Sequence, residues 1–171
     1  QQSIDAVVVA AHVITALQTV VSRSAPPSEP AVLTIGTVQA GFRSNVIAES
    51  ATLTGTIRSY TDQMKDHLVD RAQQVVDGVC AAFGATARFE HSTSCPPVVN
   101  DELLAGLVAA ESSSYFGPAS VVAAASMGAD DMADFLQARP GVYFWFGARN
   151  EKKGIAGRHH DPGFVIDEDA L

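Results

Sequence analysis

The chain has 171 residues, 47% of them hydrophobic, and its 11 basic and 19 acidic residues give a formal net charge of -8 at pH 7. This composition suits one large domain or two small ones with a real apolar core. The acidic balance argues against nucleic acid or an anionic membrane as a partner, because phosphate groups are bound by basic patches. The apolar run over residues 6–21 contains several polar side chains and is too short for a transmembrane helix.

The first half of the chain predicts a helix followed by two strands. The helix spans residues 3–23, with Ser3 as its N-cap. Apolar residues cover more than half of its circumference, so we expect it to pack on two sides, against a sheet and against a second subunit. Strands are expected at 32–40 and 51–60, and the ten residues between them are too many for a two-residue hairpin turn. In the second strand, alternation places Leu53, Gly55 and Ile57 on a covered face and Arg58 on a polar face.

A second helix is predicted over residues 62–83, where apolar residues recur at spacings of three and four and Gly84 follows as a C-terminal stop. Residues 85–91 indicate another strand. One further strand ahead of residue 1 would complete a two-helix, four-stranded ferredoxin-like unit. We therefore expect the chain to be a piece of a longer protein. The two cysteines, Cys80 and Cys95, form no disulfide framework and favour a reduced pair in a cytoplasmic protein, with a disulfide as the alternative.

The second half predicts an α/β arrangement. The stretch "STSCPPVVND" is a linker. It is followed by a helix to about residue 115, a strand over 119–126, a helix over 129–137 and a continuously apolar strand, "VYFWFGA". An uninterrupted apolar strand is typical of a sheet buried on both faces. The fold class is therefore α/β, with an α+β ferredoxin-like unit and part of a three-layer α/β domain.

The residues alone contain no complete catalytic set. His159 and His160 are consecutive, so in an extended segment they point to opposite sides and only one can easily reach a given metal. Asp130 and Asp131 stand at a helix start, where capping the helix would be sufficient reason for them. Arg58 could bind a carboxylate through two hydrogen bonds, or it could be an ordinary surface arginine.

Six stretches together resemble a known family: "SIDAVVVAAHVITALQTVVSR", "GFRSNVIAESATLTGTIRSY", "PPVVND", "SMGADDMADFL", "PGVYFWFG" and "HHDPGFVIDEDAL". They resemble, in this order, the metal-dependent amidohydrolases: aminoacylases, hippurate hydrolases and indole-acetyl-amino-acid hydrolases, which are relatives of the zinc carboxypeptidases. The resemblance implies that residues 1–94 are a dimerisation (lid) domain without its first strand. Residues 95–171 would be the C-terminal part of the catalytic domain.

The resemblance also implies a site with two divalent metal ions, zinc or manganese, and a glutamate that activates a bridging water. Aligned on Pro162 and Phe164, the metal ligand in this chain is His160. Most other ligands and the base belong to a preceding half of the enzyme. No residue of this chain is therefore assigned a catalytic role, and the 171 residues alone are expected to be inactive and to bind no metal stably.

The substrate implied by the resemblance is a small N-acyl amino acid or amide, and the enzyme would be a homodimer through the lid. Asn45 and Arg58 match positions expected to bind the substrate, partly across the dimer. Asp130 and Asp131 would lie near the site, although Asp130 is shorter than the glutamate often found there. The alternative is a non-catalytic ferredoxin-like module for dimerisation or binding, which explains residues 1–92 but not the ordered motifs after residue 95.

Overall fold

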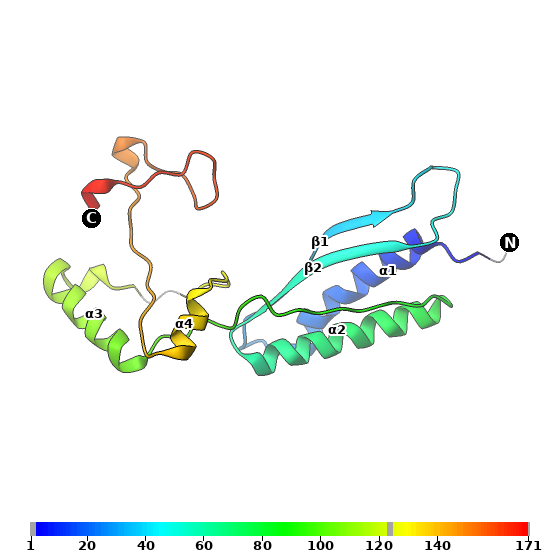
Figure 1. Ribbon diagram of the computed structural model, residues 1–171, viewed down its shortest axis with the longest axis horizontal. Helices are drawn as coiled ribbons and strands as arrows, with labels where there is room; N and C mark the ends of the chain where they lie inside the picture. Colours follow the sequence, from blue (N-terminus) through cyan, green and yellow to red (C-terminus); the bar gives the residue numbers. More distant parts are fainter. Residues whose placement is uncertain (1–2, 123–124, 171) are drawn as a thin grey trace.

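The structure, a computed structural model, describes residues 3–122 and 125–170. Figure 1 shows an elongated molecule in which a hairpin and two long helices lie at one end. Two shorter helices and the C-terminal segment lie at the other. The mixture of helices with a small antiparallel sheet is consistent with the expected α/β class.

The N-terminal helix and the hairpin form where the sequence predicts them. Helix α1 spans Ala6–Thr19 and continues as a π-helical turn over Val20–Ser24. Its N-cap is Asp5, whose side chain accepts a hydrogen bond from the Val7 N–H, so the prediction of Ser3 is wrong. Strands β1 (Ala31–Ala40) and β2 (Ala51–Ser59) pair antiparallel, with an irregularity in register between Ile35 and Thr37.

Helices α1 and α2 (Asp62–Ala82) pack on one another and on the hairpin. Thr61 caps α2, and Gly84 adopts a left-handed φ of 70° just after its end, as expected for a C-terminal stop. Leu33, Leu53 and Ile57 pack against the helices, while the threonines of β2 face away from them. The shared core is apolar, and its buried members are Val9, Val13, Leu17, Val20, Met64, Leu68, Ala72 and Cys80.

The continuous helix Ala6–Ser24 is 19 residues long and apolar enough, by length and composition, to cross a membrane. The helix is therefore longer than the apolar run over residues 6–21, and the prediction that the segment is too short is wrong. Its packing is nevertheless that of a core helix, because Val9, Val13, Leu17 and Val20 are buried against α2 and the hairpin. Both cysteines are free thiols, in agreement with the reduced pair.

The second half contains helices α3 (Glu102–Phe116) and α4 (Met132–Ala138) and short 3-10 turns at 118–120, 151–153 and 168–170. Asp101 caps α3, and α4 begins three residues later than predicted.

The strands predicted at 85–91 and 142–148 are absent from the described residues, as is strand structure in the described parts of 119–126; residues 123 and 124 lie outside them. A strand requires a neighbour for its backbone hydrogen bonds. The described residues place no second strand beside any of these segments.

Candidate functional site

Arg58 lies near the end of β2, on the face that the helices leave uncovered. Its Nη1 donates a hydrogen bond of 2.6 Å to the carbonyl oxygen of Met127, 69 residues further along the chain. The contact is partly buried. One of the two expected substrate-binding residues is therefore held against the segment that leads to Asp130 and Asp131.

The Asp130 carboxylate makes two hydrogen bonds, one with each oxygen. One oxygen accepts from the backbone N–H of Met132 at 3.0 Å, and the other accepts from the Tyr143 hydroxyl at 2.8 Å. Both bonds stabilise the ionised carboxylate, and they lower the pKa of Asp130. The same contact with Asp130 raises the pKa of Tyr143. Asp131 is exposed and its side chain does not cap α4.

Asn45 is exposed in the loop that joins β1 to β2. This loop follows the pair Ala40 and Ala51, whereas Arg58 pairs with Val32 near the opposite end of the hairpin. Arg58 lies seven positions after Ala51 along the strand, which corresponds to about 24 Å. The structure therefore does not bring Asn45 and Arg58 together within one chain.

The two consecutive histidines have different surroundings. The His159 ring lies 4.8 Å from the ring of Phe164 and 5.6 Å from that of Trp145, measured between centroids. His160 is exposed and adopts a left-handed φ of 71°, which is uncommon for a residue other than glycine. His159 thus belongs to an aromatic cluster, and the His160 ring meets the His159 ring edge-on, with 6.2 Å between their centroids.

Several residues with structural roles near these positions were missed by the sequence reasoning. The Asn100 side chain donates to the Tyr143 carbonyl at 2.9 Å and accepts from the Tyr143 N–H at 2.8 Å, so it holds this residue like a strand partner. Asp167 binds Asn150 and Lys153. One usable signal was the hydroxyl of Tyr143 in an apolar run, because such a hydroxyl generally requires a partner.

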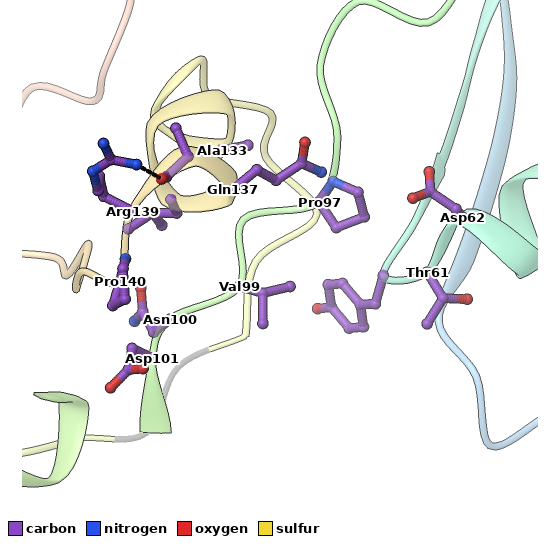
Figure 2. Close-up of a pocket in the computed structure, with 13 residues that line it drawn as sticks. Thr61, Asp62, Pro97, Val99, Asn100, Asp101, Ala133, Gln137, Arg139 and Pro140 are labelled. Atoms are coloured by element: carbon purple, nitrogen blue, oxygen red, sulfur yellow. Dashed lines mark hydrogen bonds between the residues drawn. The ribbon is translucent and has the colours of Figure 1, made fainter. Parts of the chain in front are cut away.

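A cleft of about 540 Å³ separates the start of α2 from α4. Figure 2 shows Thr61 and Asp62 on one side and Arg139 and Pro140 on the other, with Val99 between them. The cleft includes two acidic residues whose carboxylates already have partners. Asp62 pairs with Lys65 at 3.0 Å, and Asp101 caps α3. These contacts indicate a structural cleft rather than a metal site.

His160 fits the role of a single metal ligand, because an exposed imidazole can offer a ring nitrogen. Within the described ranges, no group of three or more His, Cys, Asp or Glu side chains is arranged to hold a metal ion. In Figure 1 the C-terminal turn that carries His160 also stands apart from α4 and from the hairpin loop. The structure therefore does not gather His160, Asp130 and Asn45 into one site.

The fold is shared by a solved dinuclear metal-binding peptidase. The crystal structure of the YXEP protein of Bacillus subtilis, described as such a peptidase from the M20 family, superposes with a TM-score of 0.78 at 30% identity. The superposition covers 98% of this chain and 42% of that one. The class defined by the fold is thus that of the M20 metallopeptidases.

The chain belongs to the peptidase family M20/M25/M40, whose sequence model matches residues 3–171. It is 33% identical over 169 residues to the N-acetylcysteine deacetylase of Bacillus subtilis and 30% identical over 176 residues to thermostable carboxypeptidase 2 of Saccharolobus solfataricus. Each match covers 99% of this chain and 43% of the relative. The chain therefore spans less than half the length of these relatives.

Proposed function

We propose that the protein to which this chain belongs is a metal-dependent amidohydrolase that cleaves the amide bond of N-acyl amino acids or related small amides. The family match over residues 3–171 carries this proposal. It is supported by similarity to a protein named as a deacetylase of N-acetylcysteine and to one named as a carboxypeptidase. The match includes residues 95–171, which a ferredoxin-like module alone does not explain.

In this proposal, residues 1–94 form the dimerisation domain and residues 95–171 form part of the catalytic domain. The division is supported by the packing of α1, β1, β2 and α2 around one core, which α3 and α4 do not join. A homodimer through the first region is supported by Val7 and Val8 of α1, whose side chains remain nearly half exposed. Such apolar surface is typical of an interface.

His160 is the proposed ligand to one of two divalent ions, zinc or manganese, and the other ligands belong to the rest of the protein. When bound, such ions lower the pKa of a coordinated water and polarise the amide carbonyl. Asn45 and Arg58 are proposed to bind the substrate. The hydrogen bonds of Asp130 favour a structural role for it and leave the exposed Asp131 as the better candidate for a near-site carboxylate.

We propose a cytoplasmic enzyme, since two free thiols suit a reducing compartment. The net charge of -8 supports a small substrate over nucleic acid or a membrane surface.

The proposal is tested with the full-length protein. We expect about two equivalents of zinc or manganese per subunit by elemental analysis. Hydrolysis of N-acetyl amino acids should be lost on chelation and restored by the metal. The 171-residue chain should be inactive under the same conditions, because one proposed ligand cannot hold a dinuclear site. A full-length protein that binds neither zinc nor manganese when they are supplied, and that hydrolyses none of these amides, would refute the proposal. Activity of the short chain would refute its division of the site.

A further inference from the structure

Arg58 provides an unusual connection between the two ends of the molecule. Its 2.6 Å bond to the Met127 carbonyl is the one hydrogen bond that joins residues 3–90 to residues 100–170 in the described parts of the chain. A guanidinium has five N–H donors in a fixed plane, and this bond uses one of them. The remaining donors can still bind a carboxylate through two parallel hydrogen bonds. The position of the Met127 carbonyl therefore influences where Arg58 presents these donors.

Local hydrogen bonds shape the turn containing Met127 and the start of α4, where Asp130 lies. Ser126 Oγ accepts a hydrogen bond from the Gly128 N–H at 3.1 Å, and the Asp130 carbonyl accepts one from the Ala133 N–H at 3.2 Å. The Asp130 carboxylate joins this turn to the first residue of α4. These bonds are local and fix the shape of the turn, but they do not fix its location relative to the rest of the fold.

The hydroxyl of Tyr143 supplies the contact that fixes this location. It donates to the second Asp130 oxygen from a segment 13 residues further along the chain. Tyr143 is itself held by the two hydrogen bonds of the Asn100 amide, and the neighbouring Asp101 N–H donates to the Gly141 carbonyl at 3.0 Å. A series of hydrogen bonds therefore runs from Asn100 through Tyr143 to Asp130. The short backbone segment between Asp130 and Met127 joins it to the Met127 carbonyl, which accepts from Arg58.

We propose that Tyr143 is a positioning residue for recognition of the substrate carboxylate. Its hydroxyl holds Asp130 and thereby the Met127 carbonyl, which orients the Arg58 guanidinium before the substrate arrives. Orienting a long, flexible side chain in advance reduces the ordering cost of binding. This inference rests on the proposed function, in which Arg58 binds the substrate, and it assigns the substrate carboxylate to Arg58. It extends that function by naming the residues that prepare Arg58.

The test is Tyr143→Phe in the full-length, metal-loaded enzyme. The variant keeps the ring and removes only the donor to Asp130. We expect KM for an N-acetyl amino acid to rise about 3- to 10-fold, the size of one lost hydrogen bond, with kcat little changed. KM for the corresponding C-terminal methylamide, which lacks the carboxylate, should stay unchanged. Tyr115→Phe is the matched control, because Tyr115 is 82% exposed. Equal KM increases for both substrates would overturn the proposal.

A double-mutant cycle separates this inference from the role of Arg58 itself. If Tyr143 acts through Arg58, Tyr143→Phe should raise KM much less in an Arg58→Ala background than in the wild type. Independent, additive effects would overturn the proposal for Tyr143 and leave the role of Arg58 intact. An Arg58→Ala enzyme with an unchanged KM for the carboxylate substrate would show instead that the proposed substrate role of Arg58 is wrong, and the inference would fall with it.

A second variant guards against a folding defect in Tyr143→Phe. Asp130→Ala removes the acceptor of the same hydrogen bond and should raise KM with the same preference for the carboxylate substrate. A carboxylate-specific increase in this variant would support the proposal even where the first variant unfolds. Unchanged KM in a folded Asp130→Ala enzyme would overturn it.

Discussion

Lys153 and Asp167 form an ion pair, with Nζ 2.6 Å from one carboxylate oxygen, although they lie 14 residues apart in the sequence. The other oxygen of Asp167 accepts a hydrogen bond of 2.6 Å from the Asn150 side chain. Only 7% of Asp167 is exposed. These contacts join the two ends of the segment that contains the His160 turn. The buried Asp167 carboxylate therefore stabilises the segment that carries the proposed metal ligand.

This pair predicts a pH dependence of stability. Lys153 and then Asn150 hold the pKa of Asp167 below its ordinary value of 3.8. Because the folded-state pKa is the lower one, the stabilisation is fully present above 3.8 and is lost as the pH falls through the folded-state pKa. The free energy of unfolding of the C-terminal segment should therefore decrease in that acidic window. Urea unfolding at a series of pH values, followed by Trp145 fluorescence, measures this decrease.

Asp167→Asn identifies the group responsible for this dependence. The variant should be less stable than the wild type at neutral pH and should show a shallower loss of stability in acid. Glu168→Gln is the matched control, because its exposed side chain makes no hydrogen bond in the described part of the chain. If the free energy of unfolding of Asp167→Asn falls in acid as steeply as that of the wild type, other carboxylates cause the effect.

The two histidines of the C-terminal turn should respond differently to substitution. His160→Ala in the full-length enzyme removes a proposed metal ligand, so metal content should fall and activity should drop about 100-fold or more. Substitution of a residue that only hydrogen-bonds a metal ligand already lowers metal affinity or activity 10- to 100-fold. His159→Phe keeps an aromatic ring between Trp145 and Phe164 and should retain metal and most activity. The reverse result would move the ligand assignment to His159.

Features that depend on local interactions were predicted from the sequence more accurately than features that depend on contacts with distant residues. Helix α2 and its Gly84 stop were predicted because a helix satisfies its backbone hydrogen bonds internally and its stop depends on local conformation. The segment "VYFWFGA" has the composition of a buried strand, but its backbone finds no partner strand among the described residues. Composition therefore predicted a strand buried on both faces, whereas Phe144, Trp145 and Phe146 are more than half exposed in the structure.

The candidate site was less predictable for the same reason. Capping by Asp130 and Asp131 was predicted in part, because the Asp130 side chain bonds the N–H of the first α4 residue, only two positions away. Asp131, which stands at the N-cap, makes no side-chain cap bond. Its bond to Tyr143 and the bond of Arg58 to Met127 span 13 and 69 residues and depend on the tertiary fold. The roles of Asn45, Arg58 and His160 came from family resemblance, and they remain predictions.

Two glycines should respond oppositely to substitution by alanine. A Cβ atom at Gly55 would lie 2.1 Å from the Thr34 carbonyl oxygen across the hairpin, so Gly55→Ala must displace the paired strand. We expect a loss of about 1–3 kcal/mol or more. A Cβ at Gly78 in α2 meets nothing within 4 Å, and Gly78→Ala should add about 0.5–1 kcal/mol by favouring the helix. Chemical denaturation of both variants gives the comparison, and a neutral Gly55→Ala would contradict the hairpin register.

The separation of Asn45 from Arg58 along the hairpin predicts complementation between subunits. Suppose that one substrate contacts Asn45 of one subunit and Arg58 of the other. Asn45→Ala and Arg58→Ala homodimers should then both be nearly inactive, yet each mixed dimer would contain one site with both wild-type residues. When the two variants are unfolded together and refolded at equal concentrations, random pairing makes half of the dimers mixed, so activity should return to about a quarter of wild type. Refolding each variant alone is the control. If the mixture stays as inactive as its parents, the two residues do not meet across a dimer, and the hairpin must instead bend or move to bring them together.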